Sequence, residues 1–112
     1  MGKNSKKLIL ITGCDSGIGK SLAEILIKQG YTLVVSYLKE NPFKDCAKVY
    51  SRKMDLTISD EVSAFCAFAK ELCSEYKLKA IVNNAGIALA GTVENTPLYI
   101  YQEVFDVNYF GV

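Results

Sequence analysis

The fold is decided by the stretch Lys7–Lys20, which reads KLILITGCDSGIGK. Its apolar run ends at Thr12, a glycine-rich turn follows, and an amphipathic run begins at Ile18, so the order is strand, tight loop and helix. The three glycines leave room for a sharp turn and for the close approach of an anionic ligand. The loop N–H groups and the positive end of the helix favour a phosphate or diphosphate there.

Two nucleotide-binding motifs compete for this loop. Gly19-Lys20-Ser21 matches the end of the P-loop motif G-x-x-x-x-G-K-[ST], but the first glycine of that motif would fall on Cys14. The dinucleotide motif G-x-G-x-x-G also fails, because the spacing here is G-x-x-x-G-x-G. A helix-entry loop without a ligand is the third interpretation of this stretch.

Composition places the chain among small globular domains. It has 112 residues, half of them apolar, and a net charge of +1, which gives no reason to expect nucleic acid or an acidic membrane as a partner. No apolar stretch approaches the roughly 20 residues that a membrane span requires. We therefore expect no membrane span and a cytoplasmic protein.

The cysteine and histidine content restricts the chemistry. There are four cysteines without a C-x-x-C pair, and there is no histidine. We therefore expect no metal site, no histidine base and free thiols in a reducing compartment. Cys66 and Cys73 are interpreted as core residues on one helix face.

The rest of the chain alternates between strand and helix patterns. The helix that begins at Ile18 should stop at Gly30, and strands are expected over Tyr31–Ser36, Val49–Met54 and Ala80–Asn83. A second helix follows Thr57 or Ser59, either of which could cap it, and a third begins near Leu98. The expected order β-α-β-β-α-β-α is that of one parallel-sheet domain over residues 1–112.

Four motifs in this order resemble the short-chain dehydrogenase/reductase family over residues 7–112. They are Thr-Gly-x-x-x-Gly-Ile-Gly, an acidic Asp55 after the third strand, Asn83-Asn84-Ala85-Gly86 after the fourth, and Val107-Asn108-x-x-Gly111. The resemblance implies an α/β fold with a doubly wound, Rossmann-type parallel sheet, here truncated after the fourth strand and the helix that follows it. It also implies an oxidoreductase that transfers a hydride between NAD(P) and an alcohol or carbonyl substrate.

The resemblance assigns a role to each matching residue. The diphosphate loop would be formed by Thr12, Gly13, Gly17, Ile18 and Gly19. Asp55 would accept a hydrogen bond from the adenine amino group, with the Leu56 backbone beside it, and Asn83 would tie the central strands together. Ala85 and Gly86 would border the ribose on the nicotinamide side. Asn108 would be the catalytic asparagine that orders a proton-relay water.

The cofactor preference depends on the loop and on the end of the second strand. Asp15 and Ser16 within the loop resemble the retinol and 17β-hydroxysteroid dehydrogenase branch of the family, which includes NAD users. At Tyr37, where a carboxylate would select NAD, none is present, and Lys39 could attract a 2′-phosphate. On this basis NADP is predicted over NAD.

The family's catalytic tyrosine and lysine have no counterpart in this sequence. None of the seven tyrosines is followed four residues later by a lysine. The chain is therefore predicted to be the cofactor-binding half of an enzyme, inactive alone and part of a homo-oligomer at full length. Its fourth strand would be an unpaired edge, so poor solubility is also expected. The alternatives are a non-catalytic dinucleotide-binding module and, more remotely, a P-loop NTPase.

Overall fold

The chain forms a parallel sheet with helices on both faces. The computed structural model describes residues 4–89 and 91–112. The strands pair in the order β3-β2-β1-β4, and every pairing is parallel. The predicted Rossmann-type fold is thus confirmed. The elements, in chain order, are β1 (Lys7–Ile11), α1 (Gly17–Lys28), β2 (Thr32–Tyr37), β3 (Val49–Lys53), α2 (Ser59–Leu72), β4 (Lys77–Val82) and α3 (Leu98–Asn108).

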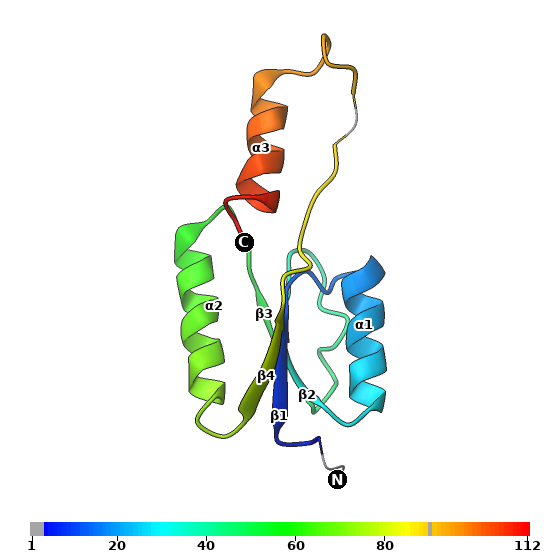
Figure 1. The fold of residues 1–112 in the computed structure, drawn as a ribbon, viewed down its shortest axis with the longest axis vertical. Helices are drawn as coiled ribbons and strands as arrows, with labels where there is room; N and C mark the ends of the chain where they lie inside the picture. Colours follow the sequence, from blue (N-terminus) through cyan, green and yellow to red (C-terminus); the bar gives the residue numbers. More distant parts are fainter. Residues whose placement is uncertain (1–3, 90) are drawn as a thin grey trace.

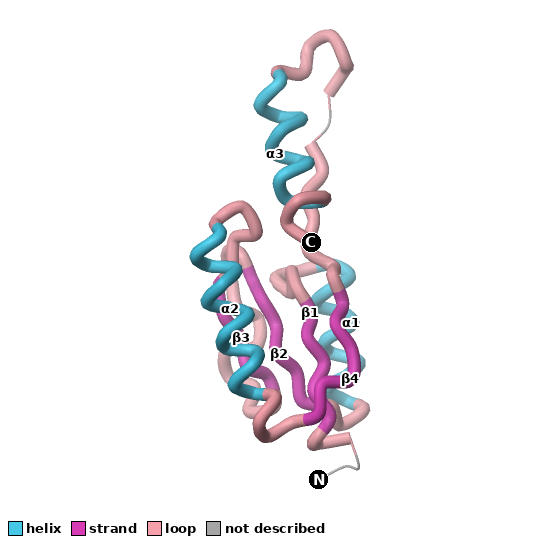
Figure 2. The backbone as a smooth tube through the Cα atoms, turned by 60° about the vertical axis from the view of Figure 1, so that its left-hand side comes forward, coloured by secondary structure: helices cyan, strands magenta, loops and turns pink. Residues whose placement is uncertain are grey.

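The alternation of side chains along β1 and β2 places one apolar cluster on each face of the sheet. Ile9, Ile11 and Leu33 belong to the cluster on the α1 face, whereas Leu8 and Val34 belong to the cluster under α2. Figures 1 and 2 show the sheet between these two helices. Burial on both faces explains why the two strands are continuous apolar runs and not alternating ones.

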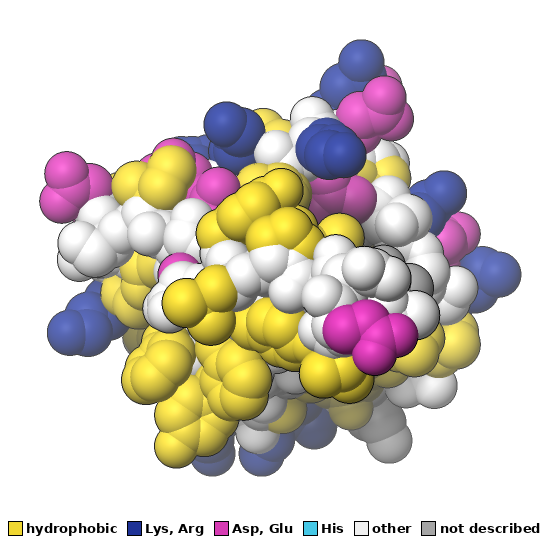
Figure 3. All heavy atoms as spheres, turned by 90° about the horizontal axis from the view of Figure 1, so that it is seen from above, with side chains coloured by type: hydrophobic (Ala, Val, Ile, Leu, Met, Phe, Trp, Pro, Cys, Tyr) yellow, Lys and Arg dark blue, Asp and Glu magenta, His cyan; other side chains and the backbone are white. Residues whose placement is uncertain are grey.

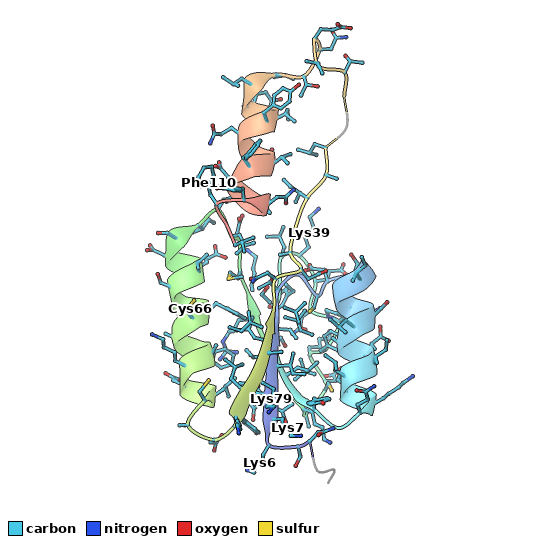
Figure 4. All side chains as sticks on the ribbon, in the orientation of Figure 1. Lys6, Lys7, Lys39, Cys66, Lys79 and Phe110 are labelled. Carbon is cyan, nitrogen blue, oxygen red and sulfur yellow. The ribbon has the colours of Figure 1, made fainter. Side chains whose placement is uncertain are left out.

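The second helix begins differently from the prediction. Its N-cap residue is Ile58, and no side chain caps it, so neither Thr57 nor Ser59 has the expected role. The Thr57 hydroxyl donates instead to the Asp55 carboxylate, at 2.6 Å between the oxygens. The prediction that Cys66 and Cys73 are core residues was also wrong, because both are exposed. Figure 4 shows Cys66 on α2.

The last helix, α3, lies apart from the sheet and from the two helices that cover the faces of the sheet. Figures 1 and 2 show α3 beyond the carboxyl ends of the strands, connected to β4 by a long loop. Seen from that end, hydrophobic side chains gather on the surface (Figure 3). The most exposed large ones in α3 and the residues after it are Leu98, Phe110, Val112, Tyr99 and Tyr109. Within residues 4–89 and 91–112, no helix has the length and apolarity that crossing a membrane would require.

Candidate functional site

A pocket of about 370 Å³ opens at the carboxyl ends of the strands. The chain leaves β1 for β2 on one side and later returns to β4 on the other, so the direction of strand order changes beside β1. Ligands of open α/β sheets bind at this kind of switch point. The pocket is lined by Gly13, Asp15, Ser16, Ser36, Tyr37, Leu38, Lys39, Met54, Asp55, Leu56, Asn84, Ala85, Gly86, Ile87 and Val107.

The three glycines of the loop serve two different purposes. Gly13 has φ +72°, and a Cβ there would lie 2.7 Å from the Cα of Ala85. A Cβ on Gly19 would collide with the Asn84 amide and with the Gly13 carbonyl oxygen. Gly17 has φ +62°, but a Cβ there would meet no atom of the described chain within 4 Å. Gly13 and Gly19 therefore permit the loop to pack, whereas Gly17 leaves open space at the start of α1.

Thr12 and Asn84 join the glycine loop to the end of β4. The Thr12 hydroxyl oxygen accepts hydrogen bonds from the backbone N–H groups of Asn84 at 3.1 Å and Ala85 at 3.0 Å. In return, the Asn84 amide donates to the carbonyl oxygens of Thr12 and Gly13 at 3.1 and 3.0 Å. The linking role expected of Asn83 thus belongs to Asn84, while Asn83 is exposed. The repeated asparagine could not be resolved from the motif alone.

Asp15 fastens the glycine loop to the segment after β2. One carboxylate oxygen, Oδ2, accepts hydrogen bonds from the N–H groups of Leu38, Lys39 and Glu40 at 3.1, 2.7 and 3.1 Å, and Oδ1 accepts a second bond from Leu38 at 2.8 Å. Partial burial acts to raise the pKa of Asp15, but the hydrogen bonds from these backbone groups outweigh it and hold that pKa below its ordinary value.

Ser36 holds the loop from the β2 side. Its hydroxyl oxygen accepts from the Gly13 N–H at 3.0 Å, and its carbonyl oxygen accepts from the Cys14 N–H at 2.9 Å. Burial, reinforced by the neighbouring charge of Asp15, raises the pKa of Cys14 to about 12. A thiol with this pKa is neutral at physiological pH, so Cys14 is a packing residue and not a nucleophile.

Asp55 borders the opposite side of the pocket. Its Oδ1 accepts hydrogen bonds from both the hydroxyl and the N–H of Thr57, and these bonds lower the pKa of the carboxyl. Its own N–H donates to the Glu61 side chain at 2.9 Å, which fixes the backbone at the end of β3. Both of these bonds are made to Oδ1, so Oδ2 is the oxygen that can receive a donor such as an amino group.

Asn108 fastens α3 to the loop after β4. Its amide oxygen accepts from the Ile87 N–H and its amide nitrogen donates to the Ile87 carbonyl oxygen, both at 2.8 Å. These two bonds place the end of α3 over Gly86, where a Cβ would approach the Asn108 oxygen to 3.2 Å. The catalytic role of Asn108 stays a prediction, and the side chain has this positioning role in addition.

The structure brings most of the predicted binding residues together. The pocket includes Gly13, Asp15, Ser16, Tyr37 and Lys39 on one side. It includes Asp55, Leu56, Ala85 and Gly86 on the other. Gly17 and Ile18 lie instead along a neighbouring hollow over the start of α1, to which Asp15 and Ser16 also contribute. Lys39 is found at the same end of the molecule as the pocket (Figure 4).

Sequence reasoning missed six of the lining residues as site residues, namely Ser36, Leu38, Met54, Asn84, Ile87 and Val107. Ser36 and Leu38 are the neighbours of the predicted Tyr37 in the sequence. Asn84 belongs to the Asn-Asn-Ala-Gly motif and Val107 to the Val-Asn-x-x-Gly motif. Each is next to a predicted site residue, and this proximity in the sequence could have identified both. Met54 and Ile87 are apolar residues that follow strands. Nothing in their local pattern separates them from core residues.

The low pKa values of Asp15 and Asp55 predict how stability depends on pH. A carboxyl whose folded pKa is depressed stabilises the fold above its unfolded pKa of about 3.9, and this contribution is lost as pH falls through the folded pKa. The unmodified chain should therefore be more stable than Asp15→Asn at pH 6, and the gap should narrow below pH 4. Urea unfolding at several pH values measures it. Asp45→Asn, at an exposed residue, is the control, and a gap independent of pH would contradict the prediction.

Comparison with protein families identifies relatives of the whole described domain. A family model described as short chain dehydrogenase matches residues 7–112. A protein named short-chain dehydrogenase RED1, from Pyricularia oryzae, is 32% identical over 114 aligned residues, which cover 99% of this chain and 40% of the relative. The chain thus spans less than half the length of this relative.

Two solved structures share the fold. The NADPH-bound carbonyl reductase from chicken fatty liver superimposes with a TM-score of 0.83 at 22% identity, over 99% of this chain and 46% of that one. A short chain dehydrogenase from Leptospira borgpetersenii with bound NAD⁺ superimposes with a TM-score of 0.81 at 24% identity, over 96% and 42%. Proteins of this fold thus accommodate either dinucleotide.

Proposed function

The chain belongs to the short-chain dehydrogenase family, and we propose that it forms the NAD(P)-binding part of an oxidoreductase acting on an alcohol or carbonyl compound. One observation carries this proposal: a single pocket joins the glycine loop, Asp55 and the Ala85-Gly86 segment. These are three segments far apart in the chain, and each has the chemistry that one part of a dinucleotide requires.

The residues present fit such a cofactor. Gly17 offers open space and a left-handed backbone at the start of α1, where N–H groups point outward, which suits a diphosphate. The Asp55 Oδ2 suits the adenine amino group. Ala85 has only a methyl side chain and Gly86 has none, which leaves room for a ribose beside them. When bound, the cofactor would supply or accept the hydride. The chain itself would bind and orient the dinucleotide and would exclude water from its reacting end.

The catalytic step needs groups beyond those in this sequence. Asn108 is the one predicted catalytic residue, and no Tyr-x-x-x-Lys pair is present. We therefore propose that the 112 residues bind the cofactor but do not turn over substrate. We further propose that the active protein is a cytoplasmic homo-oligomer in which additional sequence supplies the tyrosine and lysine. A non-catalytic dinucleotide-binding module is the second candidate function. The two hydrogen bonds between Asn108 and the Ile87 backbone favour it, because they give Asn108 a structural role.

The predicted preference for NADP now has a weaker basis. It depended on the absence of a carboxylate at the end of β2 and on the charge of Lys39. The hydrogen bonds of Asp15 bring a carboxylate to that place from the glycine loop. This contact places a negative charge beside Lys39, where the prediction assumed none.

Fluorescence titration tests the proposed function directly. Enclosure in a pocket should increase the emission of NADH or NADPH, with saturation at micromolar concentrations of protein, and NAD⁺ should compete. ATP shares the adenosine and the phosphates but lacks the nicotinamide half, so it should displace NADH more weakly than NAD⁺ does. Tighter binding of ATP than of NADH would favour a P-loop NTPase instead. Turnover of an alcohol by the 112-residue chain would show that the catalytic part of the proposal is wrong. Absence of binding to either dinucleotide would overturn it as a whole.

A further inference from the structure

We infer that Asp15 makes this site select NAD over NADP, because its carboxylate fills the anion cradle in which a 2′-phosphate would otherwise be received. The inference rests on the proposed function, since it concerns the adenosine half of the same pocket. It assigns a specificity-determining role to a residue of the glycine loop that the spacing of the motif does not require to be acidic.

The cradle consists of consecutive backbone N–H groups after β2. Those of Leu38, Lys39 and Glu40 converge on one point and all donate to the Asp15 carboxylate. Successive N–H groups that converge in this way make a general anion-binding concavity. An unoccupied cradle beside Lys39 would attract a phosphate. In this chain the position is taken by an internal anion that reaches it from 23 residues earlier in the sequence.

The carboxylate stands where dinucleotide-binding folds recognise the ribose. In these folds an acidic residue that follows the second strand accepts a hydrogen bond from the ribose 2′-OH and thereby favours NAD. Here β2 ends at Tyr37, and Leu38 and Lys39 follow. Among the described residues, the lining of the pocket includes Asp15 but not Glu40, the next acidic residue along this segment. Asp15, in the glycine loop after β1, therefore supplies the negative charge that the residues at the end of β2 lack.

The hydrogen bonds of Asp15 leave one position free for a hydroxyl group. Oδ2 already accepts from three N–H groups, whereas Oδ1 accepts from Leu38 alone. A carboxylate offers about four acceptor positions in all, and here it has three N–H donors, because the Leu38 N–H is shared between both oxygens. Oδ1, the less occupied oxygen, can therefore still receive one donor. The 2′-OH of NAD is a donor. The 2′-phosphate of NADP is an anion that cannot donate when fully ionised and is repelled by the same oxygen.

Lys39 acts against Asp15 and does not cancel it. Its N–H donates to Asp15, and the exposed residue belongs to the lining of the pocket. Figure 4 shows where Lys39 lies. The carboxylate is held by backbone groups on a fixed loop, whereas a lysine at the surface is solvated and movable. The fixed charge should therefore determine which dinucleotide binds more tightly, and Lys39 should reduce the difference without reversing it.

The experiment compares dissociation constants for NADH and NADPH by fluorescence titration of the unmodified chain, Asp15→Asn and the control Asp45→Asn. We expect the unmodified chain and the control to bind NADH at least tenfold more tightly than NADPH, because like charges in contact are strongly disfavoured. Asp15→Asn keeps an acceptor oxygen but removes the charge, so the ratio of the NADPH to the NADH dissociation constant should fall about tenfold. In a second measurement, the preference of the unmodified chain should shrink as salt is raised, because salt screens the repulsion. This measurement needs no variant to fold.

The possible outcomes are distinguishable. A fall in the ratio for Asp15→Asn but not for Asp45→Asn, together with a preference that salt reduces, supports the inference. Tight binding of both dinucleotides with a ratio that neither the variant nor salt changes overturns the inference and leaves the proposed function standing. An unmodified chain that prefers NADPH also overturns the inference alone. Binding of neither dinucleotide overturns the proposed function and the inference together.

Discussion

Replacing Gly13 with alanine should lower the free energy of unfolding by about 2–5 kcal/mol. The first contribution is the left-handed backbone at φ +72°, which costs an L-residue about 1–2 kcal/mol. The second is the overlap of the new methyl group with the Ala85 backbone, at 2.7 Å from its Cα, and forced overpacking costs about 1–3 kcal/mol. Because the opposing atom is backbone, it cannot rotate away. Urea unfolding followed by circular dichroism measures the loss.

Gly17→Ala is the matched comparison, because its backbone has nearly the same conformation without the contact. With φ +62° and open space around the new methyl group, it should lose only about 1–2 kcal/mol of stability. The methyl group would project toward the proposed diphosphate position, so NADH binding should weaken more than tenfold. Equal losses of stability in the two variants would contradict the geometry described for the loop. Unchanged NADH binding by Gly17→Ala would contradict the diphosphate assignment.

The second large effect is expected for Thr12→Val. Valine has nearly the same shape, but it removes the oxygen that accepts from the N–H groups of Asn84 and Ala85. Thr12 is only 7% exposed, and the two donors belong to half-buried residues that line the pocket, so they would have only partial access to water. A buried donor left unsatisfied costs about 1–3 kcal/mol, so two fully buried donors would cost about 2–6 kcal/mol. Because Asn84 and Ala85 are half-buried, the expected loss is about 2–4 kcal/mol for the pair.

Thr32→Val provides the control for Thr12→Val. Thr32 is buried as well, but its hydroxyl makes a single bond, donated to the Ser5 carbonyl oxygen at 2.7 Å. Its loss should therefore be about 1 kcal/mol. Thermal or urea unfolding of both variants measures the two losses in free energy of unfolding. If Thr32→Val lost as much stability as Thr12→Val, the link between the glycine loop and β4 would contribute no more than any buried hydroxyl.

The elements could be predicted from the sequence because their signals are local. The apolar runs of β1 and β2 and the stop at Gly30, where φ is +90°, depend on a few neighbouring residues. The start of α2 could not be predicted in the same way. Thr57 had two possible hydrogen-bond partners, the helix N-terminus and the Asp55 carboxylate, and the structure selects the second. Short-range competition of this kind has no signature in the pattern.

The candidate site was predictable as a set of motifs but not as a set of contacts. The sequence places Asn83 and Asn84 side by side, and strand geometry, which only the structure provides, decides that Asn84 faces the glycine loop. Asp15 is the clearer example. Its partners are more than twenty residues away, and the approach of two parallel strands brings them together. This long-range pairing is the basis of the proposed preference for NAD.

Hydrogen–deuterium exchange with and without NADH tests the central claim most directly, because it reports where on the chain a dinucleotide binds. We predict protection in three separated segments, around Gly13–Gly19, Asp55–Leu56 and Ala85–Gly86, with α2 unaffected. The chain can be studied at micromolar concentration, which limits association through its exposed β4 edge. Protection that is absent, or that is confined to α2 or to the surface of α3, would contradict the assignment of this pocket to NAD(P).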